Sequence, residues 1–143
     1  MTQDLLVTAG EEFFVTENTD GVTLTVGLYD DSTDNLGEDG VVDDITSEPT
    51  NDNYSTQTSP FSASNIDGNW GISNDTLISF DFSDTTDQSM EVDTAFVLAS
   101  FNSEELGSTG DHLIANPSLS QLRKVGSIDT LEISVGDAEL LLE

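Results

Sequence analysis

The sequence predicts an all-β fold, an antiparallel β-sandwich of jelly-roll type, and three observations support this prediction. Apolar residues recur at every second position in the main apolar stretches. Turn-forming pairs, including Asp20-Gly21, Asp39-Gly40 and Asp67-Gly68, separate the stretches at spacings of roughly 8 to 15 residues, which suits a sandwich. Helical periodicity is weak throughout the chain. A two-layer sheet packing is therefore expected.

Four longer stretches are the main expected strands. Residues 22–29 alternate most clearly, and residues 76–82 and 129–135 follow the same pattern. The stretch 90–101 begins by alternating and ends almost continuously apolar, which predicts a central strand covered on both faces toward its end. These patterns predict the following inward-facing residues: Val22, Leu24, Val26, Leu28, Ile78, Phe80, Phe82, Phe96, Leu98, Leu131 and Ile133.

Shorter elements complete the expected fold. The candidate strands are 4–8, 41–46, 54–61, 69–72, 112–115 and 138–142, and one helical turn fits at each of 11–17 and 118–125. The short polar segment 83–89 suggests a hairpin that pairs the strands at 76–82 and 90–101. Since there is neither an internal repeat nor a linker, the chain is expected to form one domain, residues 1–143.

Charge is the strongest compositional signal. The chain has 29 Asp and Glu against 2 Lys and Arg, a formal net charge of -27. Such a charge is typical either of disorder or of folding in concentrated salt. The 7 Phe, 2 Tyr and 1 Trp, placed within alternating stretches, argue against disorder. In molar salt the screening length falls to about 3 Å, so we expect a salt-adapted protein from a halophilic host.

The same charge excludes two classes of partner. Nucleic-acid binding needs clusters of Lys and Arg, whereas Arg123 and Lys124 are the only basic side chains of these types. An anionic membrane surface is disfavoured for the same reason. The chain has no cysteine, no basic-apolar leader segment and no apolar stretch approaching about 18 residues. We expect synthesis and assembly in the host cytoplasm at high salt.

Few residues are suited to catalysis, and we expect a protein that is not an enzyme. His112 is the only histidine, and the sequence lacks a Gly-x-Ser-x-Gly nucleophile turn. The position of His112, before a short apolar stretch, predicts a side chain packed at the rim of a sheet. Among 29 carboxylates some neighbours arise by chance, so a paired-carboxylate pattern indicates no glycosidase.

Oxygen-rich runs are the candidate cation sites. The first contains Asp30, Asp31 and Asp34; the second contains Asp81, Asp84 and Asp87; a third spans 65–69. Calcium takes about six to eight oxygen ligands from loops of this kind. None of the runs has the spacing of a calcium loop with a distal glutamate. The prediction is therefore solvated acidic loops without a cofactor, loosely associated with Na⁺, K⁺ or Mg²⁺.

Several short sequence segments, taken in order along the chain, resemble a family of small structural proteins of tailed viruses, including marine phages and haloarchaeal viruses. The segments are 21–34 (GVTLTVGLYDDSTD), 44–49 (DITSEP), 53–54 (NY), 68–70 (GNW), 78–81 (ISFD), 92–97 (VDTAFV) and 127–134 (SIDTLEIS). None of them is a chemical motif, and the family supplies no catalytic residues. The resemblance implies a role in virion structure, on the head surface or in the tail.

From these observations we expect an accessory virion protein, a decoration or turret subunit on the capsid. A tail or baseplate subunit is one alternative. A module that binds host glycans is another, and it would use Trp70, Tyr29 and Tyr54 as stacking platforms. The expected partners are further copies of the chain, as a trimer or pentamer, and other virion proteins such as the major capsid protein. The apolar stretches 13–15 and 140–142 are suited either to assembly or to the protomer's own core.

Overall fold

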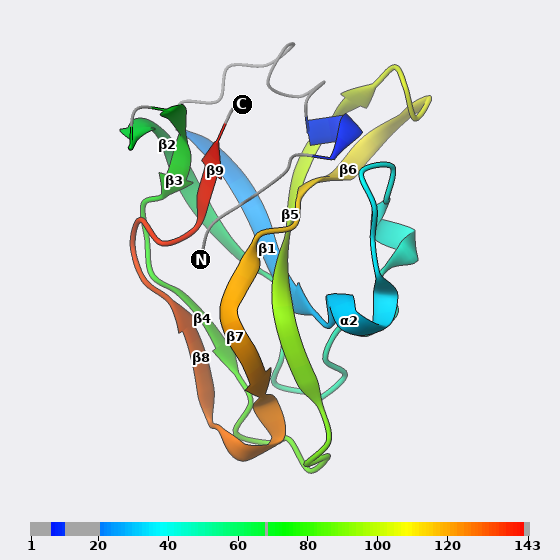
Figure 1. Ribbon diagram of the computed structural model, residues 1–143, viewed down its shortest axis with the longest axis vertical. Helices are drawn as coiled ribbons and strands as arrows, with labels where there is room; N and C mark the ends of the chain where they lie inside the picture. The colour runs from blue at the N-terminus through cyan, green and yellow to red at the C-terminus, as the bar shows by residue number, and fades with distance from the viewer. Residues whose placement is uncertain (1–6, 11–20, 68, 142–143) are drawn as a thin grey trace.

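The prediction of an antiparallel, sandwich-like all-β fold is confirmed. The structure, a computed structural model, describes residues 7–10, 21–67 and 69–141. Nine strands lie within these residues (Figure 1), and every recorded strand pairing is antiparallel. They are β1 Val22–Tyr29, β2 Gln57–Ile66, β3 Asn69–Asn74, β4 Ile78–Asp81, β5 Glu91–Ser103, β6 Ser108–Ala115, β7 Ser118–Lys124, β8 Thr130–Ile133 and β9 Glu139–Leu141. The short helix α2 (Asp31–Asp34), a helical turn at residues 8–10 and 3-10 turns at Val42–Asp44 and Val125–Ser127 complete the described elements.

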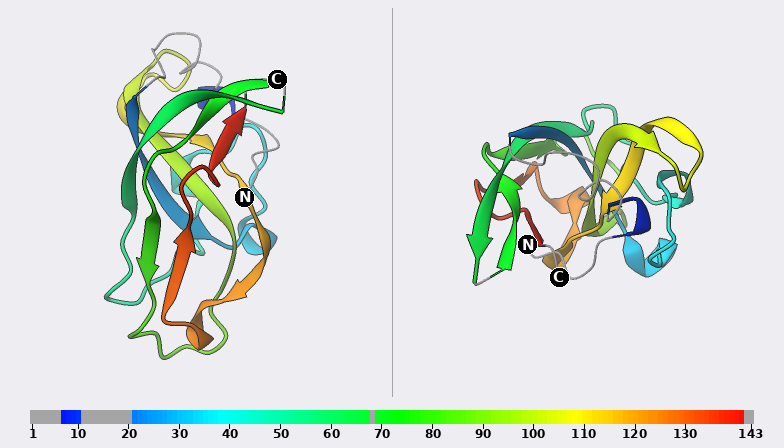
Figure 2. Two further views of the ribbon diagram at one scale, coloured as in Figure 1. Left: turned by 90° about the vertical axis from the view of Figure 1, so that its left-hand side faces the viewer. Right: turned by 90° about the horizontal axis from the view of Figure 1, so that it is seen from above.

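The strands form a curled sheet that nearly closes on itself. The main sheet has the order β6-β5-β1-β2-β3-β9, with β7 paired to β5, while β4 and β8 form a second ladder. Since β3 runs on into β4 and β8 runs on into β9, the two ladders make one interrupted ribbon (Figure 2, left). Seen from above, the strands are arranged in a ring (Figure 2, right). Among the described strands β7 and β8 do not pair, and we call the opening between them the β7/β8 seam.

β5 is the central strand, as its sequence predicts. One edge pairs with β1 through Thr94–Leu98, and the other pairs first with β7 and then with β6. Its residues are partly exposed at Glu91 and Asp93 and are buried from Thr94 to Ala99. Both faces of this later part are therefore covered, which confirms the expectation drawn from the near-continuous apolar sequence.

The core has two parts, one on each face of β5. All of the residues expected to face inward are buried except Val22, which is partly buried and packs against the larger part. Phe96 and Leu98 belong to the smaller part, because they alternate with Val97 and point to the other face. The remaining members of this smaller part are Val7, Tyr29 and Leu113, and Leu36, Val42 and Ile45 pack against it. The loop after β1 thus covers the second face.

Two expectations about local structure are wrong. The hairpin between 76–82 and 90–101 does not form, because β5 uses its edges for β1, β6 and β7, and β4 pairs with β8. The segment 118–125 contains strand β7 in place of a helical turn, since its main chain pairs with β5.

Other expectations differ mainly in their limits. The segment 41–46 contains a 3-10 turn in place of a strand, because the Asp44 carboxylate accepts a hydrogen bond from the Val41 N–H at 3.1 Å. β2 starts at Gln57, three residues after the expected start at Tyr54, and it continues to Ile66. The stretches 4–6, 11–17 and 142 lie outside the described residues, and the described end of the expected strand 4–8 is not a strand, since residues 8–10 form a helical turn.

Asn74 bridges the interruption of the ribbon. Its side chain is 1% exposed. The Nδ2 group donates to the carbonyl of Thr76 at 2.8 Å and to that of Ser134 at 3.0 Å, while Oδ1 accepts from the N–H of Ala138 at 2.9 Å. One amide therefore satisfies three main-chain groups that the broken ladder leaves without strand partners, which a buried site requires.

Candidate functional site

Asp30 and Asp34 hold the loop after β1. Asp30 caps α2, accepting hydrogen bonds from the Ser32 N–H at 3.1 Å, the Ser32 hydroxyl at 2.5 Å and the Thr33 hydroxyl at 2.9 Å. Asp34 accepts from the N–H groups of Thr46 at 3.0 Å and Ser47 at 3.1 Å, and from both of their hydroxyls. Asp30 is therefore a turn-forming acceptor, whereas Asp34 ties α2 to a later part of the loop, and the chain itself engages the oxygens of both carboxylates.

Asp31 joins the same loop to the sheet. Its Oδ1 accepts from the Leu36 N–H at 2.9 Å and from the Tyr29 hydroxyl at 3.0 Å, and its own N–H donates to Asp93 at 2.7 Å. Asp30 and Asp31 are adjacent in the sequence, but their carboxylates bind different groups and do not form one set of cation ligands.

The second acidic run follows the same pattern. Asp81 accepts from Ser83, and Asp87 accepts from Ser89, each through one N–H and one hydroxyl. Asp84 accepts from the Asn51 side-chain amide at 2.6 Å and from the Asn53 N–H at 3.0 Å. Within the described residues no group of three or more His, Cys, Asp and Glu is placed to hold a metal ion. In the third run the side chains of 65 and 69 lie outside the description.

Hydrogen bonds lower the pKa of four of these aspartates. For Asp30 and Asp34, burial raises the pKa, but bonds from the Ser32, Thr33, Thr46 and Ser47 donors outweigh it, and the net shift is downward. For Asp81 and Asp87, the hydroxyl and N–H groups of Ser83 and Ser89 lower the pKa. All four carboxylates thus favour the charged form in the folded state.

Acid is therefore expected to destabilise the fold through these carboxylates. A folded pKa below the ordinary 3.8 adds stability above that pH, and this stability is lost as the pH falls through the folded value. Asp34→Asn should lower the free energy of unfolding by about 1–3 kcal/mol at neutral pH. The new asparagine would place an NH₂ group against the N–H and hydroxyl donors that now bond to the carboxylate. The substitution should also flatten the loss of stability below about pH 4.

Urea unfolding of Asp34→Asn and of Asp43→Asn across this pH range is the measurement. Asp43 is exposed and neighbours the same loop, so its variant removes an equal charge without removing the loop contacts of Asp34. Equal acid sensitivity in the two variants would contradict the assignment to Asp34.

Tyr29 and Tyr54 are turned inward. Tyr29 is fully buried; its hydroxyl donates to Asp31 and accepts from the Asn116 amide at 3.1 Å. The Tyr54 ring stacks on Phe80 and Phe82 at centroid distances of 5.8 Å, and burial raises the pKa of both tyrosines. Neither ring is a free stacking platform, and the side chain of Trp70 lies outside the description.

His112 is buried near the edge of the main sheet. It is 7% exposed, its ring lies edge-on to Phe101 at a centroid distance of 5.0 Å, and Nε2 lies 3.2 Å from the Ser108 carbonyl. This placement agrees with the packed rim position expected from the sequence.

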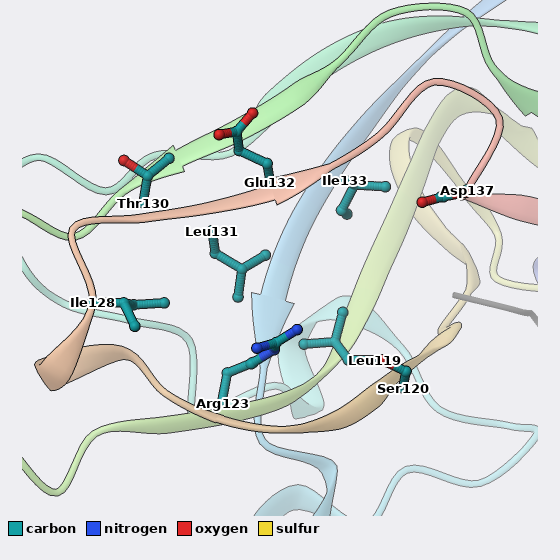
Figure 3. A pocket seen from close by; sticks show the side chains of 9 residues that line it. All are labelled: Leu119, Ser120, Arg123, Ile128, Thr130, Leu131, Glu132, Ile133 and Asp137. Atoms are coloured by element: carbon teal, nitrogen blue, oxygen red, sulfur yellow. The ribbon is translucent and has the colours of Figure 1, made fainter.

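A hollow of about 290 Å³ opens at the β7/β8 seam (Figure 3). Its apolar lining comes from both sides: Leu119 from β7, Ile128 from the linking turn, and Leu131 and Ile133 from β8. The Arg123 side chain points into it from β7, with its guanidinium between Leu119 and Leu131 (Figure 3). The polar lining residues are Ser120, Thr130, Glu132 and Asp137. The hollow therefore combines apolar side chains with the only arginine.

The edge of β8 that faces the seam carries main-chain groups free for pairing. The Phe82 N–H donates to the Asp129 carbonyl at 2.7 Å, which starts the β4/β8 ladder. Because hydrogen-bonding direction alternates along a strand, Leu131 and Ile133 point their main-chain groups toward β4. Those of Thr130 and Glu132 then point toward the seam, where no described strand pairs with them.

Arg123 retains hydrogen-bonding capacity in the hollow. When the Gln121 amide is oriented so that its oxygen faces the guanidinium, this oxygen accepts hydrogen bonds from Nη1 of Arg123 at 3.0 Å and from Nη2 of Arg123 at 3.3 Å. A guanidinium has about five N–H donors in a planar fork suited to a carboxylate. The remaining donors are suited to binding an anionic group.

The sequence alone does not predict this site, because Arg123 stands out there only as too little positive charge for binding nucleic acid. The available signal was a lone arginine beside Leu119 and Leu122 in an otherwise acidic chain. The hollow itself depends on β7 and β8 lying side by side, which local periodicity does not indicate.

Comparison with known proteins gives no relative to guide the function. No family model, curated protein or solved structure matches the chain. Among the described residues, no helix is both long enough and apolar enough to span a bilayer.

Proposed function

We propose that this chain is an accessory structural protein of a virus particle, a decoration or turret subunit on the capsid of a tailed virus with a halophilic host. The observation that carries the proposal is the position of the sequence segments that resemble virion proteins. Several of these segments coincide with strands of the fold: 21–34 contains β1, 78–81 is β4, 92–97 lies within β5, and 127–134 contains β8. A resemblance in framework strands is what a shared fold would leave, and we infer the shared structural role from that fold.

The acidic composition supports a halophilic host. Several aspartates serve as acceptors in tight turns, as Asp30, Asp81 and Asp87 do with the serine two positions later. With 29 acidic and 2 basic side chains, however, the charge exceeds what such turns use. Molar salt screens the remaining repulsion.

The glycan-binding alternative has less support, because Tyr29 and Tyr54 are engaged in the interior. A tail or baseplate subunit makes the same demands on the fold as a capsid subunit does. The number of copies per particle separates these two locations.

Quantitative mass spectrometry of purified particles from a salt-lake host tests the proposal. A capsid decoration should appear in a fixed and high ratio to the major capsid protein, whereas a tail subunit should appear in a few copies. An abundant host protein, followed through the same density gradient, controls for contamination. Particles that lack this chain, or that contain it only at the level of the host protein, would overturn the proposal.

A further inference from the structure

Two copies of this chain repel each other over most of their surfaces. The formal net charge of each is -27, and the only Lys and Arg side chains are Arg123 and Lys124. Both lie on β7. An ion pair between a carboxylate of one copy and a Lys or Arg of another therefore has to be made at β7, whatever else the contact contains.

We infer that the hollow at the β7/β8 seam receives an acidic, protruding segment of a second copy, with a carboxylate of that copy bound to Arg123. Charge complementarity favours this occupant, because every copy offers 29 Asp and Glu. The inference deepens the self-association contained in the proposed function. It rests on the geometry of the hollow, and it can fail without affecting the presence of the chain in particles.

The lining explains how such a segment is held. Leu119, Leu131 and Ile133 provide apolar contact for a side chain beside the bound carboxylate. The main-chain groups of Thr130 and Glu132 provide an edge to which an extended segment can hydrogen-bond. Arg123 is exposed in the single chain, and the incoming segment would cover its guanidinium against Leu119 and Leu131, so that the ion pair, once formed, is shielded from the salt that screens exposed charges.

The two carboxylates of the lining direct the approach of the segment. Glu132 points to the opposite side of β8 from Arg123, and Asp137 lies at the end of the hollow beyond Ile133 (Figure 3). The incoming carboxylate therefore reaches the guanidinium from the β7 side, away from both acidic groups.

The shape of the contact limits the symmetry of the assembly. A concave hollow is not filled by the same hollow of a second copy, so the donor segment and the hollow are different surfaces. Two copies can exchange such segments reciprocally in a two-fold dimer, or each copy can fill the hollow of the next in a heterologous contact, which produces a closed ring when its rotation closes. A ring of this kind agrees with the trimer or pentamer expected for a subunit at a capsid symmetry axis.

The test compares Arg123→Gln with Lys124→Gln in about 3 M KCl, where exposed charges are screened. The two variants remove the same charge from neighbouring positions of β7, but only Arg123 lines the hollow. Sedimentation velocity over a range of concentrations should show that the wild-type chain assembles. Arg123→Gln should weaken assembly by at least about tenfold, as expected for loss of a charge pair that the second copy covers, while Lys124→Gln should change it by less than about threefold.

A third variant tests the hollow without changing charge. Ser120 is exposed at its lip, so Ser120→Trp should block the hollow while leaving the core intact. Circular dichroism and melting temperature establish that each variant folds. A monomeric wild-type chain, equal assembly of the Arg123 and Lys124 variants, or full assembly of Ser120→Trp would each overturn the inference. Particle mass spectrometry is independent of all three outcomes and tests the proposed function alone.

Discussion

Raising KCl from about 0.1 M to about 3 M at neutral pH is expected to raise the melting temperature by roughly 15 °C or more. Folding brings 29 carboxylates together with only 2 Lys and Arg side chains. Two like charges about 8 Å apart repel by about 2 kcal/mol at an effective dielectric constant near 20. Net stability of a domain is only about 5–15 kcal/mol, so many such pairs are able to unfold the chain at low salt.

Thermal unfolding followed by circular dichroism across this salt series is the measurement. Glu105→Lys provides a matched comparison, because Glu105 is exposed in the turn between β5 and β6. Its charge reversal should raise the melting temperature at low salt and reduce the dependence on KCl. A melting temperature that is flat or falls with added KCl would contradict both the role of repulsion and the halophilic origin.

Mild acid should partly replace salt, but only within a limited range. Protonation near pH 5 at low salt reduces the overall repulsion, and stability should rise. Asp30, Asp34, Asp81 and Asp87 have lowered pKa values, and their hydrogen bonds require the charged form. Below about pH 4 the loss of these bonds should dominate, so that stability passes through a maximum.

Asn74→Ala is expected to destabilise the fold by on the order of 3 kcal/mol or more, the largest loss expected from one side chain here. The substitution leaves the carbonyls of Thr76 and Ser134 and the N–H of Ala138 without this partner in the interior. Each buried group left unsatisfied costs about 1–3 kcal/mol. Separation of the β3/β9 ladder from the β4/β8 ladder should accompany the loss.

Urea unfolding at constant high KCl measures this effect without changing the ionic strength. Asn53→Ala is the control, because the exposed Asn53 side chain makes, among the described residues, only a long contact of 3.4 Å with the Ser83 hydroxyl. A difference of less than about 0.5 kcal/mol between the two variants would show that Asn74 does not hold the ribbon together.

Much of the strand framework was predictable because alternation reports burial directly. β1, β4 and β8 bury every second side chain over most of their length, so their sequences carry the period of a strand. β7 was missed because its side chains are exposed or, at Leu119, only partly buried, which leaves no period to read. The pairing of β4 with β8 was also missed, because it joins segments about 50 residues apart and depends on which edges β5 leaves available.

The candidate site was harder to predict than the fold. Asp30, Asp34, Asp81 and Asp87 were recognisable as oxygen-rich loops, but sequence spacing did not show that serine and threonine donors occupy them. Arg123 was visible as a lone basic residue, whereas its apolar surroundings come from β7 and β8 together. The local sequence pattern therefore indicated which residues were candidates for a site, and long-range packing determined which groups those residues contact.

The turns in which an aspartate accepts from a following serine or threonine divide the acidic residues into two groups for protein engineering. A version of this protein for dilute buffers would replace exposed residues such as Asp43 and Glu105 with neutral or basic ones. Replacing Asp30 or Asp81 in the same way would remove a turn-forming acceptor along with the charge, and replacing Asp34 would remove the acceptor that ties α2 to Thr46 and Ser47. Acidic residues can thus be replaced at one group of positions, whereas replacement at the other group is harmful, even though all of these residues carry the same charge.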